Sequence, residues 1–197
     1  MVSIEEIKRL KDLTGVGLTD AKQALEAANG DFDKALEEMR KKGMTKADKR
    51  GEREARQGLV GTYNHDGRIG VLVEINCETD FVARNEIFVN LVKDVAMHIA
   101  ASNPEFVSAD NIPEDVQEAA RKEFTEKVRA EGKPENMIEN IVNGMLKKHF
   151  AEKCLLDQPY VKNPDITVGQ YVKEHGARLG ENVVVRKFAR IGLGEVA

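Results

Sequence analysis

The fold of this chain is organised around residues 69–84, which read IGVLVEINCETDFVAR. The first seven of these residues are rich in β-branched side chains, which favour a strand. A short polar segment then carries one isolated aromatic residue, Phe81, before an amphipathic helix begins near residue 85. Loops between rigid elements commonly carry recognition groups, so the sequence predicts a candidate site directly after the strand.

Residue type alone leaves two interpretations of Phe81. Phenylalanine is usually buried, and on that basis its side chain folds back under the sheet as an ordinary core residue. In the other interpretation the side chain stays exposed on the loop and takes part in recognition. The sequence keeps both open.

The strand belongs to a predicted hairpin with one apolar face. Asp66–Gly67 separates it from the β-rich run 59–64, and this dipeptide favours a tight turn whose central residues need positive φ. A third β-rich run, 183–191, most simply pairs with the hairpin, which gives a three-stranded antiparallel sheet. The residues expected on its covered face are Ile69, Val71, Val73 and Ile75.

Helices are expected to pack with this sheet. An αα-hairpin is expected over about 113–150, with a Gly/Pro turn between its two helices. A capping box at Thr167–Gln170 opens a short helix that Gly176 is expected to end. Residues 58–197 therefore predict an α+β core. The amphipathic helix that begins near residue 85 is expected to cover the sheet with its apolar face. The residues of this face are Ile87, Phe88, Leu91, Val92, Val95 and Ile99.

Residues 1–43 follow a different pattern, that of three short helices. A capping box at Ser3–Glu6 opens the first helix, Thr19 is expected to cap the second, and Asp31 the third. This pattern resembles a ubiquitin-associated-type bundle, which buries little and is suited to presenting a surface. The turn at Gly15–Gly17 is either a plain connection or a contact with a partner.

A charged linker is expected over residues 44–57. The run from Lys41 to Arg56 holds seven basic and three acidic residues, which is typical of a solvated segment that buries nothing. The alternative is a phosphate-contacting patch, but the run has no interleaved aromatic residues for base stacking.

Composition fits a cytoplasmic protein without membrane or nucleic-acid contacts. Hydrophobic residues make up 41% and charged residues 32% of 197 residues, which permits a packed core. No apolar run approaches the ~20 residues that span a bilayer, and the N-terminus has no secretory pattern. The net charge of −4 does not support direct nucleic-acid binding. Two isolated thiols, Cys77 and Cys154, fit a reducing compartment.

No catalytic set stands out. Cys77 could act as a nucleophile with His65 as base, although a buried structural thiol is the more ordinary interpretation. The four histidines lack metal-ligand spacing, and Asp80 stands alone. The phosphate-binding loop pattern is absent from the sequence. We therefore expect a protein that is not an enzyme and has no cofactor and no metal.

Several stretches together resemble one known family. Thr79–Val82 is similar to the signature of bacterial elongation factor Ts, the guanine-nucleotide exchange factor for elongation factor Tu. The similarity runs in the right order across nearly the whole chain. The other matching stretches are 7–10, 14–17 and 20–25 in the family's N-terminal domain, and 154–159 and 181–183 in its C-terminal part.

This resemblance implies a mechanism. The loop formed by Thr79, Asp80, Phe81 and Val82 would intrude beside the Mg²⁺ site of elongation factor Tu, so that GDP is released and GTP can bind. Phe81 matches the family's aromatic wedge, and Asp80 matches the acidic residue beside it. The N-terminal bundle would dock on the partner's nucleotide-binding domain. The residues implied in that docking are Leu13, Thr14, Gly15, Val16 and Gly17.

The resemblance also implies an oligomeric state. Many family members carry a second core half, whereas this chain has one copy and resembles the short class, whose members form homodimers.

The alternative to an exchange factor is an adaptor whose N-terminal bundle recognises ubiquitin-like or helical ligands, with the α+β core as scaffold. Binding to purified elongation factor Tu with faster release of labelled GDP would separate the two.

Overall fold

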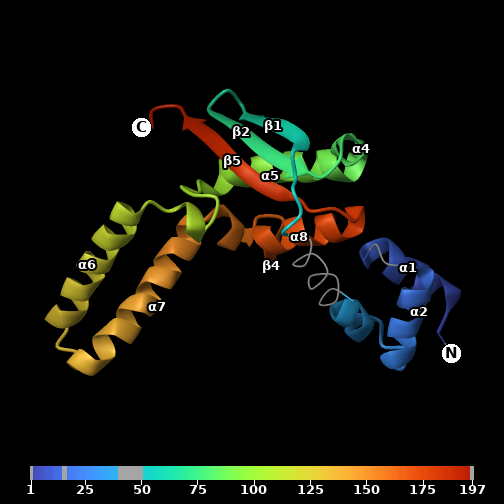
Figure 1. The fold of residues 1–197 in the computed structure, drawn as a ribbon, viewed down its shortest axis with the longest axis horizontal. Coiled ribbons are helices and arrows are strands. Elements are labelled where there is room, and N and C mark those ends of the chain that lie inside the picture. Colours follow the sequence, from blue (N-terminus) through green and yellow to red (C-terminus); the bar gives the residue numbers. More distant parts are fainter. Residues whose placement is uncertain (1, 15–16, 40–50, 196–197) are drawn as a thin grey trace.

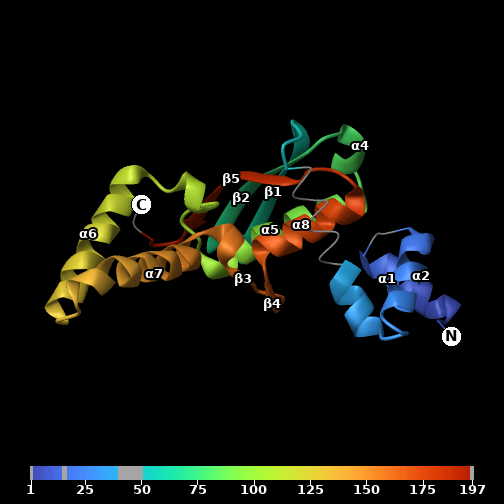
Figure 2. The ribbon, with the colours of Figure 1, turned by 60° about the horizontal axis from the view of Figure 1, so that its bottom comes forward.

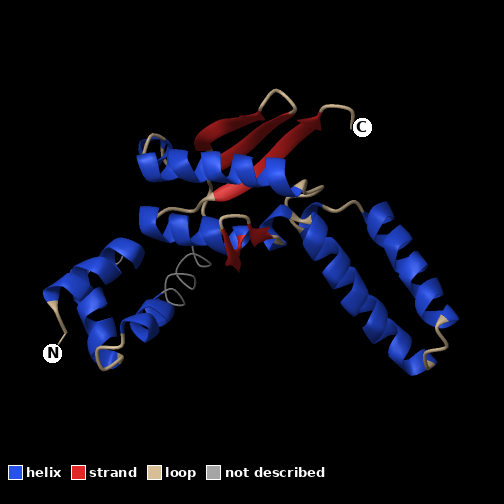
Figure 3. Cartoon of the chain, turned by 180° about the vertical axis from the view of Figure 1, so that it is seen from behind, coloured by secondary structure: helices blue, strands red, loops and turns tan. Residues whose placement is uncertain are grey.

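A computed structural model describes residues 2–14, 17–39 and 51–195 of the chain (Figure 1). The core is layered: a three-stranded antiparallel sheet is covered on one face by α5 (Glu86–Ser102), and α8 (Val168–Leu179) packs beyond α5 (Figure 3). The predicted α+β class is therefore confirmed.

The sheet has the expected strands. It contains β1 (Gln57–His65), β2 (Ile69–Cys77) and β5 (Val184–Gly192), and β2 lies in the centre with an antiparallel neighbour on each side. The predicted hairpin turn is confirmed, because Asp66 and Gly67 have φ values of 51° and 68°. Such positive angles match the twist that joins two adjacent antiparallel strands.

One face of the sheet forms the main core. Val71, Val73 and Ile75 of β2 are buried against α5, as their alternation predicts, and Phe88 of α5 is fully buried among them. On the opposite face Leu72 stays half exposed. Among the described residues, helices cover one face of this sheet and leave its outer face open.

Helix α8 differs from the expectation at its end. The capping box between Thr167 and Gln170 is confirmed, but the prediction that Gly176 ends the helix is wrong. The helix continues to Leu179, and Gly180 closes it with a φ of 78°. Gly176 lies inside the helix at a point where the following chain comes close: a Cβ there would lie 3.0 Å from the Glu181 carbonyl oxygen, a tighter contact than side chains normally make. A small two-stranded sheet of β3 (Pro159–Tyr160) and β4 (Asn163–Thr167), which was not predicted, precedes α8.

The predicted αα-hairpin is confirmed. It consists of α6 (Glu114–Ala130) and α7 (Glu135–Lys153), which project together from the core (Figures 1 and 2). The 3₁₀ turns η1 (Ala109–Asn111) and η2 (Leu155–Asp157) flank it at its base. The hairpin has a small hydrophobic cluster of its own, formed by Val128, Ile138, Val142 and Leu146.

The N-terminal helices form a separate cluster. They are α1 (Ile4–Thr14), α2 (Leu18–Ala27) and a helix over 32–39, with Leu10 and Leu25 fully buried among them. The caps predicted at Ser3 and Asp31 are confirmed by hydrogen bonds from the amides of Glu6 and Lys34. The cap predicted at Thr19 is wrong, because α2 already begins at Leu18 after Gly17. The likeness to a ubiquitin-associated domain stays a prediction.

Part of the expected linker packs on the core. Residues 40–50 lie outside the described residues, but 51–56 are described, and Ala55 is only 2% exposed. The backbone carbonyl of Ala55 accepts a hydrogen bond from the Arg186 guanidinium at 3.1 Å. The expectation that the whole charged run buries nothing is therefore wrong at its end, and the domain bounds at 43 and 57 stay predictions.

Candidate functional site

The segment after β2 forms a short helical turn, α4 (Asp80–Ala83), where the sequence suggested a loop. Thr79 is its N-cap, and its hydroxyl oxygen accepts from the amide of Val82 at 3.3 Å. Asn85 caps α5 directly afterwards by accepting from the amide of Ile87 at 2.9 Å. The turn thus lies directly between the central strand and the helix that covers the sheet.

Phe81 points away from the core. Its side chain is 86% exposed, so the interpretation of Phe81 as a core residue is wrong. The physical reason is the helical turn, which buries Ala83 and partly buries Val82 and so directs Phe81 outward. Asp80 beside it is exposed and pairs with Arg84 at 3.3 Å. Exposed pairs of this kind stabilise weakly.

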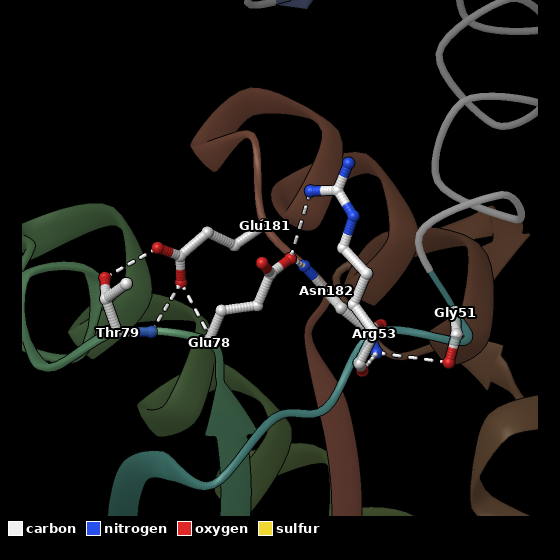
Figure 4. A network of polar contacts seen from close by, with 6 residues as sticks. All are labelled: Gly51, Arg53, Glu78, Thr79, Glu181 and Asn182. Atoms are coloured by element: carbon white, nitrogen blue, oxygen red, sulfur yellow. Dashed lines mark hydrogen bonds and ion pairs between the residues drawn. The ribbon is translucent and has the colours of Figure 1, made fainter.

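A carboxylate from a distant part of the chain holds the start of this turn (Figure 4). One Glu181 oxygen accepts from the amides of Glu78 and Thr79 at 3.0 Å each. Its other oxygen accepts from the Thr79 hydroxyl at 2.6 Å. Residue patterns did not reveal this contact, because more than 100 positions separate the partners and no local pattern marks them.

Cys77, at the end of β2, is a structural thiol. Its side chain is fully buried, and its sulfur donates a hydrogen bond to the backbone carbonyl of Thr79 at 3.2 Å. Burial, and next the charge of Glu181, raise the pKa of Cys77 to about 11. In the β1–β2 ladder Cys77 lies opposite Gln57, which is eight residues from His65 along β1. Eight residues of extended strand span roughly 26 Å, so Cys77 and His65 cannot form a nucleophile–base pair.

The described residues show no candidate metal centre. Among them, no three His, Cys, Asp or Glu side chains are grouped so that they could hold a metal ion. The buried His98 is instead engaged in the core, where its ring nitrogens contact the Gln158 side chain at 3.0 Å and the amide of Val161 at 3.2 Å. Within the same described ranges, no helix is long and apolar enough to span a bilayer.

Helices α1 and α2, which flank the second predicted contact region, lie at the same end of the molecule as α4 (Figures 1 and 2). Leu13 at the end of α1 is 48% exposed, and the hydroxyl of Thr14 donates to the carbonyl of Leu10 at 2.6 Å. Gly17 is the N-cap of α2, whose first residue, Leu18, is 53% exposed. The predicted contact residues Gly15 and Val16 lie outside the described residues.

Comparison with known proteins gives one consistent result. The family model described as Elongation factor TS matches residues 5–195. Elongation factor Ts of Desulfosudis oleivorans is 47% identical over 195 residues, which is 98% of each chain. That of Geobacter sulfurreducens is 48% identical over 98% of this chain and 90% of its own length. That of Caldanaerobacter subterraneus is 47% identical over 99% and 98%.

Proposed function

The chain belongs to the elongation factor Ts family, and from this premise we propose that it binds elongation factor Tu with GDP and promotes release of the GDP. Elongation factor Ts is a nucleotide exchange factor, so the chain needs no covalent chemistry of its own. GTP then binds to the emptied site of the partner. Because translation takes place in the cytoplasm, the proposal places the chain there.

The observation that carries the proposal is the exposure of Phe81. The chain has seven phenylalanines, all within the described residues, and Phe81 is the one whose side chain is exposed. An exposed aromatic costs solvation free energy unless a partner covers it, and aromatic residues often anchor interfaces. The helical turn between β2 and α5 presents it on a fixed frame. This arrangement supports a wedge formed by Thr79, Asp80, Phe81 and Val82.

Displacement of the Mg²⁺ ion would weaken the binding of GDP to the partner. Mg²⁺ demands near-ideal octahedral coordination at short distances, so small shifts of its surroundings weaken its binding sharply. Once the ion is lost, the diphosphate lacks its main charge partner. The Phe81 wedge with Asp80 beside it would act on that site in elongation factor Tu. The effect is a coupling between two binding equilibria.

Release of labelled GDP from elongation factor Tu tests this function. The intact chain should accelerate release, and excess Mg²⁺ should reduce the acceleration because the ion competes with the wedge. Removing Mg²⁺ with a chelator should speed GDP release in the absence of the chain. Adding the chain should then raise the release rate only slightly. A release rate that the chain leaves unchanged at every Mg²⁺ concentration would contradict the proposal.

The N-terminal helices are proposed to dock on the partner and add affinity. The exposure of Leu13 and Leu18, on either side of residues 15–17, supports this role. A double variant, Leu13→Ser with Leu18→Ser, should bind elongation factor Tu more weakly and exchange normally at saturation. Ile4→Ser is a matched control, because Ile4 is 72% exposed and lies about half a turn around α1 from Leu13. Equal weakening of binding by the control would contradict docking through this end of α1 and α2.

A homodimer is proposed through the outer face of the sheet. Four exposed apolar residues gather on or beside this face: Val60, Leu72, Ile191 and Leu193. Self-association is the commonest way to cover such a surface in a soluble protein. Light scattering at micromolar concentration should report about twice the 21.9 kDa chain mass, and Leu72→Lys should lower it. A monomer for the unmodified chain would contradict the dimer.

A further inference from the structure

The turn that carries Phe81 has little support of its own. A helix of four residues is far too short to be stable by itself, and the N-cap bond from Val82 to Thr79 is long at 3.3 Å. Ala83 is the buried residue of α4, while Phe81 and Asp80 face solvent. Contacts from elsewhere must therefore hold the turn in one orientation.

Glu181 supplies such contacts. Its carboxylate accepts three hydrogen bonds from two consecutive residues, Glu78 and Thr79, at 2.6–3.0 Å (Figure 4). Charge-assisted bonds of this length are about twice as strong as neutral ones. The Thr79 hydroxyl has one hydrogen and two lone pairs, so donation to Glu181 leaves a lone pair for the amide of Val82. The same carboxylate thus orients the cap of α4.

The backbone around Glu181 is itself fixed. Gly180, with a φ of 78°, closes α8, and the amides of Gly180 and Glu181 donate to the Gly176 carbonyl at 2.9 and 3.2 Å. The arrangement is reciprocal, because the amide of Asn182 donates to the Glu78 carboxylate at 2.7 Å. Glu78 and Glu181 therefore fasten the two segments from both sides.

A third segment closes the network. The buried Asn182 side chain donates to the carbonyls of Gly51 and Arg53 at 3.2 and 2.7 Å. The Arg53 guanidinium lies 3.6 Å from the Glu78 carboxylate and compensates part of its charge. The turn thus rests on a frame made by α8, β5 and the segment that enters β1 (Figure 4).

We propose that Glu181 is a positioning residue for exchange, which holds the Thr79–Val82 turn so that Phe81 is presented in one orientation. The inference rests on the proposed function, since Phe81 must act on a partner for its orientation to matter. Glu181 itself need not touch the partner. Its removal should loosen the turn while leaving the buried core, which depends on other residues, in place.

The first experiment measures the turn without any partner. The chain contains no tryptophan, so Phe81→Trp introduces a single fluorophore at the turn. Its anisotropy should fall when Glu181→Ala is added and should stay unchanged with Glu126→Gln, a removal of charge at an exposed position of α6. An anisotropy that Glu181→Ala leaves unchanged would overturn the proposal, whether or not the chain is an exchange factor.

The second experiment measures GDP release from elongation factor Tu at saturating concentrations of each variant. Glu181→Ala should lower the maximal rate about tenfold, with Glu181→Gln between it and the unmodified chain. In a chain that already carries Phe81→Ala, Glu181→Ala should cause less than about a twofold further loss. Such non-additivity distinguishes positioning of Phe81 from general destabilisation.

Two outcomes at this stage would overturn the inference. One is a maximal rate of GDP release that Glu181→Ala does not change. The other is a double variant whose fold-loss in rate equals the product of the fold-losses of Glu181→Ala and Phe81→Ala. If Glu181→Ala does not fold, Glu181→Gln gives the same comparison with a smaller expected loss. If the unmodified chain does not accelerate release, the proposed function has failed, and the anisotropy still decides whether Glu181 holds the turn.

Discussion

Helices α4 and α5 follow one another on the chain but are held in opposite ways. Helix α5 is anchored by apolar burial, with Phe88 fully enclosed, whereas α4 is held by hydrogen bonds at its start and leaves Phe81 86% exposed. Two phenylalanines seven positions apart therefore contribute differently. The first is available to a partner, and the second stabilises the fold. Residue type did not distinguish them, but their position relative to the sheet does.

The largest expected effect is the loss of the buried ring. Phe88→Ala should lower the free energy of unfolding by about 3–5 kcal/mol, because it leaves a cavity in the main core. Phe81→Ala should change it by less than about 0.5 kcal/mol, as is usual for exposed positions. Urea unfolding of both variants checks this contrast. Similar losses for the two would remove the distinction between the helices.

A smaller effect is expected at the cap of α4. Thr79→Ala removes the hydroxyl that accepts from Val82 and donates to Glu181, which should cost about 1 kcal/mol. Thr79→Ser keeps the hydroxyl and is the matched control. Thermal unfolding of both variants gives the comparison. If serine costs as much as alanine, the polar contacts of the hydroxyl do not hold the turn.

The mildest effect concerns pH and the buried His98 of α5. Burial lowers the pKa of His98 in the folded chain, so below about 6.5, its ordinary value, the unfolded chain binds the proton more readily. The free energy of unfolding should therefore be constant above that pH and decline as the pH falls below it, until the folded pKa is reached. Burial also lowers the pKa of His175, which adds a decline of the same sign.

Urea unfolding between pH 5 and pH 8 measures this decline. Comparing His98→Asn with the unmodified chain over this range isolates the contribution of His98 to the pH dependence of the free energy of unfolding. Its curve should be flatter because the variant cannot take up the proton. An unchanged slope would mean that His98 contributes nothing to the pH dependence.

Local patterns predicted most of the fold. The hairpin follows from Asp66–Gly67, since few residues accept positive φ, and the burial of β2 follows from its alternation. Prediction failed where packing of the following chain overrides a local signal. Gly176 reads as a helix end but lies inside α8, where the Glu181 carbonyl oxygen would lie only 3.0 Å from an added Cβ.

The candidate site was predictable only in part. The resemblance located Thr79–Val82, but whether Phe81 is buried depends on how the turn leaves the sheet. Helix α4 takes its direction from contacts with Glu181, more than 100 residues further along the chain. Such contacts have no spacing or periodicity that a sequence could display. The same holds for Ala55, whose burial in a highly charged run depends on where that run meets the core.

The claim that Phe81 acts as an exposed wedge is tested most directly by titrating preformed complexes with GDP. The two binding equilibria are linked. If the chain weakens GDP binding to elongation factor Tu by a given factor, GDP must weaken binding of the chain by the same factor. The Phe81→Ala complex should therefore be less sensitive to added GDP and Mg²⁺ than the unmodified complex, while the two free chains melt at nearly the same temperature. A Phe81→Ala chain that melts far lower yet keeps the full antagonism would contradict this role.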